Sequence, residues 1–70
     1  MVLENVRAEC KKQGLSLRYV ERESGLSNGA ISKWKNSMPA SDNLQAVANV
    51  LGVKTEFLLR NEEQNKKGGE

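Results

Sequence analysis

The chain has 70 residues, 37% hydrophobic and 29% charged, with a formal net charge of +2. A chain this short forms one small core, which excludes a large enzyme scaffold. It contains no histidine and one cysteine, so neither a Cys/His zinc site nor an internal disulfide can form, and we expect no metal or cofactor. Its apolar runs are far shorter than the roughly 20 residues that cross a bilayer. We therefore expect a small cytoplasmic domain that is stabilised by helix packing or dimerisation.

Two short amphipathic helices are predicted first. Apolar residues recur at spacings of three and four over residues 3–10, and Gly14 follows as a helix terminator. Ser16 is expected to cap a second helix over residues 17–24. Cys10 stands in register with the apolar stripe, so we expect a buried, inert thiol rather than a redox sensor.

A tight turn and a third helix follow. Residues 24–27 read Ser-Gly-Leu-Ser, which favours a turn in which Ser27 caps a helix over residues 28–35. Ala30, Ile31 and Trp34 form an apolar stripe on this helix, so we expect Trp34 in the core. From Ser24 to Ser41 the sequence contains no acidic residue, and its only charges are two lysines. The outer face of the third helix is therefore predicted to be polar and cationic.

The last two helices complete the predicted core. Pro39 favours a loop before Ser41, which is expected to cap a fourth helix that ends at Gly52. Thr55 is expected to cap a fifth helix over residues 56–60. Residues 61–70 lack apolar side chains and are expected to be a disordered polar tail or a truncated linker. The prediction is an all-α, compact five-helix domain over residues 1–60 that includes a helix-turn-helix.

The third helix carries the chemistry of a DNA reader. A helix that enters the major groove needs short polar and cationic side chains near its start and an apolar back. Asn28 can bind adenine, Ser32 can bond to several bases, and Lys33 can reach guanine or a phosphate. Gly29 specifies no base, but it lets the backbone approach DNA closely. The base-facing set is therefore Asn28, Gly29, Ser32 and Lys33.

Phosphate contacts are expected on both sides of this set. Helix N-termini and polar side chains next to a reading helix commonly hold the DNA backbone. For Arg18 a local ion pair on the helix surface is an equal alternative. Tyr19 is expected as an ordinary surface aromatic, with a phosphate contact as its alternative. The phosphate set consists of Ser16, Leu17, Arg18, Ser27, Lys35 and Asn36.

The order and spacing of several motifs resemble the Cro/repressor-type helix-turn-helix family. The resemblance implies a lambda-repressor-like fold, recognition of a double-stranded DNA operator by the third helix, and often a homodimer on a two-fold symmetric site. The motifs are Gly14-Leu15-Ser16, Gly25-Leu26-Ser27, Ile31-Ser32-Lys33-Trp34, Leu51-Gly52-Val53 and Phe57-Leu58-Leu59.

Four positions depart from the pattern that the resemblance implies. Leu17 stands where the family commonly has glutamine. A side-chain phosphate contact is therefore in question at Leu17, and Arg18 is expected to take over part of it. Glu21 stands where the family often has a small alanine at the helix contact, so Glu21 is expected to bend outward or to pair with Arg18. Cys10 and Lys35 replace a frequent Arg–Glu pair, and the joint replacement leaves Lys35 free for DNA.

The predicted function is a phage or bacterial transcriptional regulator of the repressor type. No catalytic residue is predicted, because the chain has no histidine and its serines are assigned to helix caps. Phe57 is expected at the dimer interface, since three consecutive apolar residues cannot all face one core. The alternative is a protein-interaction module, such as an antitoxin or a regulator-binding helix-turn-helix, that does not depend on DNA. Such a module should expose apolar anchors on the third helix.

Overall fold

The computed structural model describes residues 1–60, which are helical and contain no strand. The predicted all-α class is confirmed, with one change: within the described range four helices are α-helical, and the third predicted helix is a short 3-10 helix. None of the described helices is long and apolar enough to cross a membrane. The tail predicted over residues 61–70 lies outside the described residues. The elements are α1 (Val2–Gln13), α2 (Leu17–Glu23), η1 (Ile31–Lys35), α3 (Ser41–Leu51) and α4 (Thr55–Leu59).

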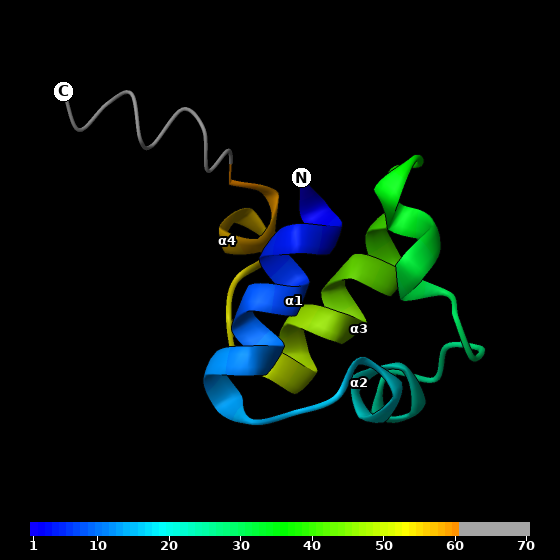
Figure 1. Ribbon diagram of the computed structural model, residues 1–70. Coiled ribbons are helices and arrows are strands. Elements are labelled where there is room, and N and C mark those ends of the chain that lie inside the picture. Colours follow the sequence, from blue (N-terminus) through cyan, green and yellow to red (C-terminus); the bar gives the residue numbers. More distant parts are fainter. Residues whose placement is uncertain (61–70) are drawn as a thin grey trace, which may run out of the picture.

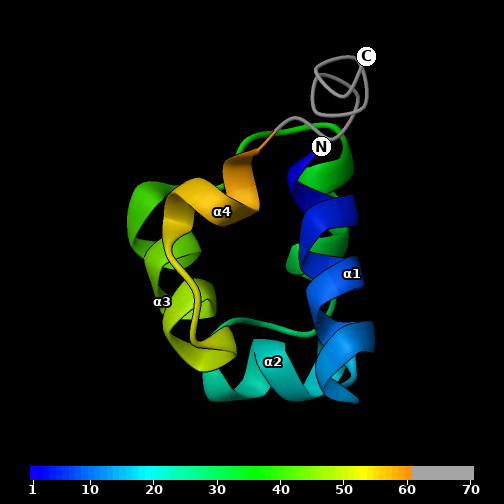
Figure 2. The same ribbon diagram turned by 90° about the vertical axis from the view of Figure 1, so that its left-hand side faces the viewer.

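The two longest helices, α1 and α3, form the frame of the domain. Both start at the same end of the molecule, and α2 lies across the end at which they finish (Figure 2). The opposite end is covered by α4, which packs against both α1 and α3. The 3-10 helix η1 packs against α1 on the side away from α4 (Figure 1). This arrangement leaves one side of η1 and one side of α2 on the surface.

A single apolar core joins all five elements. Val6, Val20, Ile31, Val47 and Leu58 come one from each element, and all five are fully buried. Full burial of an aliphatic side chain stabilises a fold by about 1.5–3 kcal/mol. The complete core consists of Val2, Leu3, Val6, Cys10, Val20, Ile31, Trp34, Leu44, Val47, Ala48, Leu51 and Leu58.

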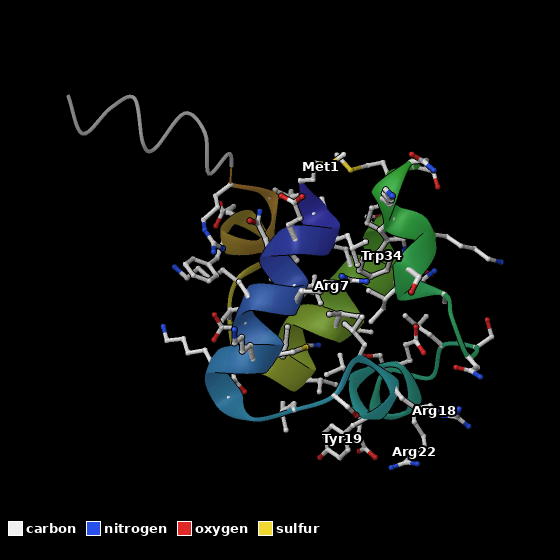
Figure 3. The ribbon with its side chains drawn as sticks, in the orientation of Figure 1. Met1, Arg7, Arg18, Tyr19, Arg22 and Trp34 are labelled. Atoms are coloured by element: carbon white, nitrogen blue, oxygen red, sulfur yellow. The ribbon has the colours of Figure 1, made fainter. Side chains whose placement is uncertain are left out.

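The predicted burial of Trp34 and Cys10 is confirmed. The Trp34 ring turns from η1 into the body of the domain (Figure 3), and only 8% of the residue is exposed. Cys10 is 3% exposed. Burial raises the pKa of its thiol, and the neighbouring Glu9 carboxylate acts in the same direction. The thiol is therefore held in its neutral, unreactive form.

The helix ends follow the sequence signals in part. Gly14 and Gly52 close α1 and α3 in the left-handed conformation, with φ of +73° and +72°, as predicted. The Ser16 hydroxyl accepts the Tyr19 backbone N–H at 3.0 Å, so the predicted cap of α2 is confirmed.

The predicted caps at Ser41 and Thr55 are wrong. Both residues are the first residues of their helices, and no side chain caps either α3 or α4. The extended residue before each helix is Ala40 or Lys54. The hydroxyls therefore lie inside the first turn, where they cannot accept the free N–H groups in the manner of an N-cap.

Candidate nucleic-acid interface

Residues 28–35, which we call the reading segment, are less regular than predicted. Residues 28–30 form a turn, and η1 begins only at Ile31. Gly29 has a φ of +87°, a conformation that side chains other than glycine disfavour and that interrupts a right-handed helix. The predicted helix over residues 28–35 is therefore wrong for its first three residues.

The reading segment has a buried side and a polar outer side. Ile31 is fully buried and Trp34 nearly so. Because a 3-10 helix has three residues per turn, these two residues share one face. Gly29 is half-buried. The exposed residues of the segment are Asn28, Ser32, Lys33 and Lys35. The structure thus places all the predicted base-facing residues on one short segment whose back is anchored in the core.

The start of the reading segment is held by Glu21 of α2. Glu21 is 4% exposed. Its Oε1 accepts the Gly29 backbone N–H at 3.0 Å, and its Oε2 accepts the Ile31 backbone N–H at 3.0 Å. The expectation that Glu21 bends outward or pairs with Arg18 is therefore wrong. The turn at Gly29 leaves two amides facing α2, and the carboxylate satisfies both.

The expected cap at Ser27 is also wrong, for the same reason. The residue before η1 is Ala30, and no side chain at that position caps the helix. The Ala30 N–H donates to the backbone carbonyl of Ser27 at 3.1 Å, and Ser27 is exposed. Glu21 therefore performs the task that the sequence pattern assigned to Ser27.

The outer side of α2 adds two arginines. Arg18 and Arg22 are exposed and extend from α2 away from the body of the domain (Figure 3). Tyr19 is 39% exposed beside them. Leu17 is half-buried and packs against the core, so its side chain does not face outward with Arg18. Sequence reasoning left Arg22 out of the site; its spacing of four residues from Arg18 was the available signal.

The C-terminal end of the reading segment contributes Lys35 and Asn36, which are both exposed. Both line a surface hollow together with Glu4 and Met38. Glu4 thus brings an acidic side chain close to the C-terminal end of the reading segment. Glu21 contacts the N-terminal end of the segment, but its carboxylate lies beneath the surface. The exposed charge on the reading segment itself is positive.

A family model described as helix-turn-helix matches residues 6–58. No curated protein matches the chain. The matched range starts within α1 and ends within α4, so it includes α2, the turn and the whole reading segment. It covers most of the chain. The chain therefore belongs to the Cro/repressor-type helix-turn-helix family of DNA-binding regulatory domains.

Proposed function

We propose that this protein is a transcriptional regulator of the phage or bacterial repressor type, which binds a specific double-stranded DNA operator in the cytoplasm. The observation that carries the proposal is the two-sided reading segment. Its back is fixed by the buried Ile31 and Trp34, and its exposed side carries Asn28, Ser32 and Lys33. A short polar surface on a rigid support is what readout of base edges in the major groove requires.

The base contacts follow from the chemistry of the exposed side chains. Asn28 presents a carboxamide, which matches the donor and acceptor of adenine in the major groove. Lys33 presents a cation, which suits the two acceptors of guanine. Ser32, which directly precedes Lys33 and is exposed, can donate or accept. Gly29 carries no side chain, so the backbone at the turn can come close to the DNA.

Phosphate contacts are proposed on both sides of the reading segment. Lys35 and Asn36 are exposed at its end, and Ser16, Arg18 and Ser27 are exposed before it. Arg22 joins this set because it extends from α2 beside Arg18 (Figure 3). Two arginines four residues apart on one helix repel each other by a few tenths of a kcal/mol, and a DNA phosphate would remove that cost. The Leu17 side chain packs against the core, so Leu17 can contact a phosphate only through its main chain.

We propose a homodimer whose interface includes Phe57. Phe57 is 39% exposed, and with Val53 it lines a surface hollow. The hollow is bordered by exposed side chains of both signs, Lys12, Lys54 and Glu56, and by the nearly buried Glu9, whose carboxylate accepts a hydrogen bond from Gln13. A two-fold interface places each patch against its own copy, so acids and lysines can be matched across it. Two copies would also double the base contacts of one short reading segment.

Selection of bound sequences from a random duplex library tests this function. We expect one enriched, two-fold symmetric site with half-sites about one helical turn apart. Binding to that site should weaken as salt is raised, because phosphate contacts release counterions. A folded protein that enriches no sequence would contradict the proposal.

One observation favours the alternative, a protein-interaction module. Met38, Met1 and Leu59 are 72%, 59% and 44% exposed and line the hollow beside Lys35. Exposed apolar side chains that share a hollow are typical of protein-binding sites. They lie outside the reading segment, however, whose exposed residues are polar. Substitution of Met38 by serine should leave DNA selection unchanged; if it abolished DNA binding in a folded protein, the boundary between the two surfaces would be wrong.

A further inference from the structure

The reading segment begins with two backbone amides that its own helix does not satisfy. At the start of the segment, the Ala30 N–H donates to the Ser27 carbonyl at 3.1 Å and the Lys33 N–H donates to the Ala30 carbonyl at 3.2 Å. Gly29 and Ile31 have no such backbone acceptor. The first N–H groups of a helix need an acceptor from outside, and burial makes an unsatisfied group costly.

Glu21 satisfies both amides with one side chain. Each carboxylate oxygen accepts one N–H at 3.0 Å, and the bond to Ile31 is buried. Hydrogen bonds to an ionised acceptor are stronger than those between neutral groups. A charge that is 4% exposed also carries a desolvation cost. The carboxylate is therefore stable at this place only while the Gly29 turn keeps both amides pointed at it.

We propose that Glu21 is a positioning residue for DNA recognition. The proposal rests on the proposed function. Glu21 fixes the start of the reading segment relative to α2, and this sets the direction in which Asn28 and Ser32 leave the surface. The base-reading side chains then depend on α2 for their placement, rather than on the regularity of the 3-10 helix that carries them.

The same contact determines how the segment meets DNA. Two free amides at a helix start would attract a phosphate without regard to sequence. Here the Glu21 carboxylate occupies both amides. Side chains, rather than these main-chain groups, must therefore make the contacts of the reading segment. Loss of Glu21 should consequently reduce specific binding while leaving non-specific binding unchanged or slightly stronger, because a negative charge is removed.

The test compares Glu21→Gln and Glu21→Ala with a charge-matched control, Glu23→Gln. Glu23 is an exposed residue of the same helix. The measured quantity is the ratio of affinity for the selected duplex to affinity for a shuffled duplex. We expect this ratio to fall about tenfold or more in both Glu21 variants, as loss of a hydrogen bond to a charged group predicts. The control should keep the wild-type ratio.

Amide hydrogen exchange provides the second readout. Exchange should accelerate at Gly29 and Ile31 in Glu21→Gln, while the core amides of Val47 and Leu51 keep their wild-type rates. An affinity ratio that survives in both variants overturns the positioning role. An equal loss of both affinities with faster exchange at every amide means that the variant unfolds globally, and the wild-type measurement described next then decides. If the wild-type protein itself shows no preference between the duplexes, the proposed function has failed and the positioning role fails with it.

A measurement on the wild-type protein covers variants that do not fold. Scalar couplings across the two hydrogen bonds, from the Glu21 carboxyl carbon to the Gly29 and Ile31 nitrogens, are expected both in the free protein and in its complex with the selected duplex. Loss of these couplings in the complex would overturn the proposal, because the contact would then be absent when bases are read.

Discussion

The side chain of Asn5 in the first helix donates to the backbone carbonyl of Leu58 in the last, at 2.8 Å and across 53 positions of the chain. The same Nδ2 donates to the Arg60 carbonyl at 2.7 Å. Asn5 is 1% exposed. The final carbonyls of a helix have no partner within it, so Asn5 satisfies the end of α4 from α1. This contact ties the C-terminal helix, and the proposed dimer surface on it, to the rest of the domain.

Replacement of Asn5 by alanine should therefore destabilise the domain. The buried Leu58 carbonyl and the part-buried Arg60 carbonyl would lose this donor, and an unsatisfied buried carbonyl costs about 1–3 kcal/mol. Urea unfolding of Asn5→Ala measures the loss. Asn49→Ala is the matched control, because Asn49 accepts one exposed hydrogen bond from Gln45, and a change of a few tenths of a kcal/mol is expected there. Equal losses in the two variants would show that the link between α1 and α4 adds no stability.

Gly29 should be required for its backbone conformation rather than for space. A Cβ built there meets no atom within 4 Å, whereas its φ is +87°. Gly29→Ala should thus cost about 1–2 kcal/mol through strain alone. Asparagine tolerates positive φ better than alanine, so Gly29→Asn should cost less when both are measured by chemical unfolding. If asparagine cost as much as alanine, strain at φ would not be the reason for glycine.

The two lysines of the reading segment should differ in what they contribute to binding. Lys33→Ala should weaken the selected site by about 1–3 kcal/mol and relax the preference at one base position. Lys35→Ala should weaken selected and shuffled duplexes alike and lower the salt slope by about one. Lys11, an exposed lysine in the last turn of α1, supplies the control Lys11→Ala. If Lys33→Ala bound the selected site with unchanged affinity, the proposed placement of the reading segment on the DNA would be wrong.

Cys10 should make the stability of the domain sensitive to alkaline pH. Burial raises the pKa of its thiol in the folded state. The unfolded chain releases the thiol proton near pH 8.5, so above that pH the unfolded state binds fewer protons and stability falls. Below it, Cys10 contributes no pH dependence. The stability difference between wild type and Cys10→Ala should consequently narrow as pH rises from 8 to 10, measured by urea unfolding at each pH.

The pH dependence of the stability difference between wild type and Cys10→Ala can also contradict this prediction. A difference that stays constant across this range would mean that the folded and unfolded thiols titrate alike. Cys10→Ser should act on stability only, with the DNA affinity of the folded fraction unchanged. Alkylation of Cys10 in the wild type should follow the rate of unfolding, because only the open chain exposes the thiolate.

The ends of the helices were predictable where a single residue type determines them. Gly14 and Gly52 end helices because glycine adopts positive φ without strain. The 3-10 geometry of η1 was not predictable, because Ile31 and Trp34 are three residues apart and share a face at either 3.6 or 3.0 residues per turn. The misplaced cap at Ser41 has a related cause. A serine before an apolar run fits both the capping position and the first helical position, and the backbone of Ala40 decides between them.

The exposed part of the candidate site was also predictable, since Asn28, Ser32 and Lys33 stand opposite an apolar stripe. Glu21 was not. Its role depends on two amides that only become available when Gly29 turns the chain, eight residues further on. A local pattern does not record which backbone groups a distant turn leaves unsatisfied. An acid at a helix contact that usually takes a small side chain was the one available signal.

The most direct test of the account is binding of the wild-type protein to selected duplexes in which single purines are replaced by their 7-deaza analogues. This change removes one acceptor from the major groove and leaves the minor groove intact. We predict that binding weakens by about 1–3 kcal/mol when the substituted purine is one of the one or two that are read in each half-site. In the Lys33→Ala variant, substitution of the purine that Lys33 reads should cause no further loss of affinity. Unchanged affinity at every purine would contradict readout of the major groove by residues 28–35.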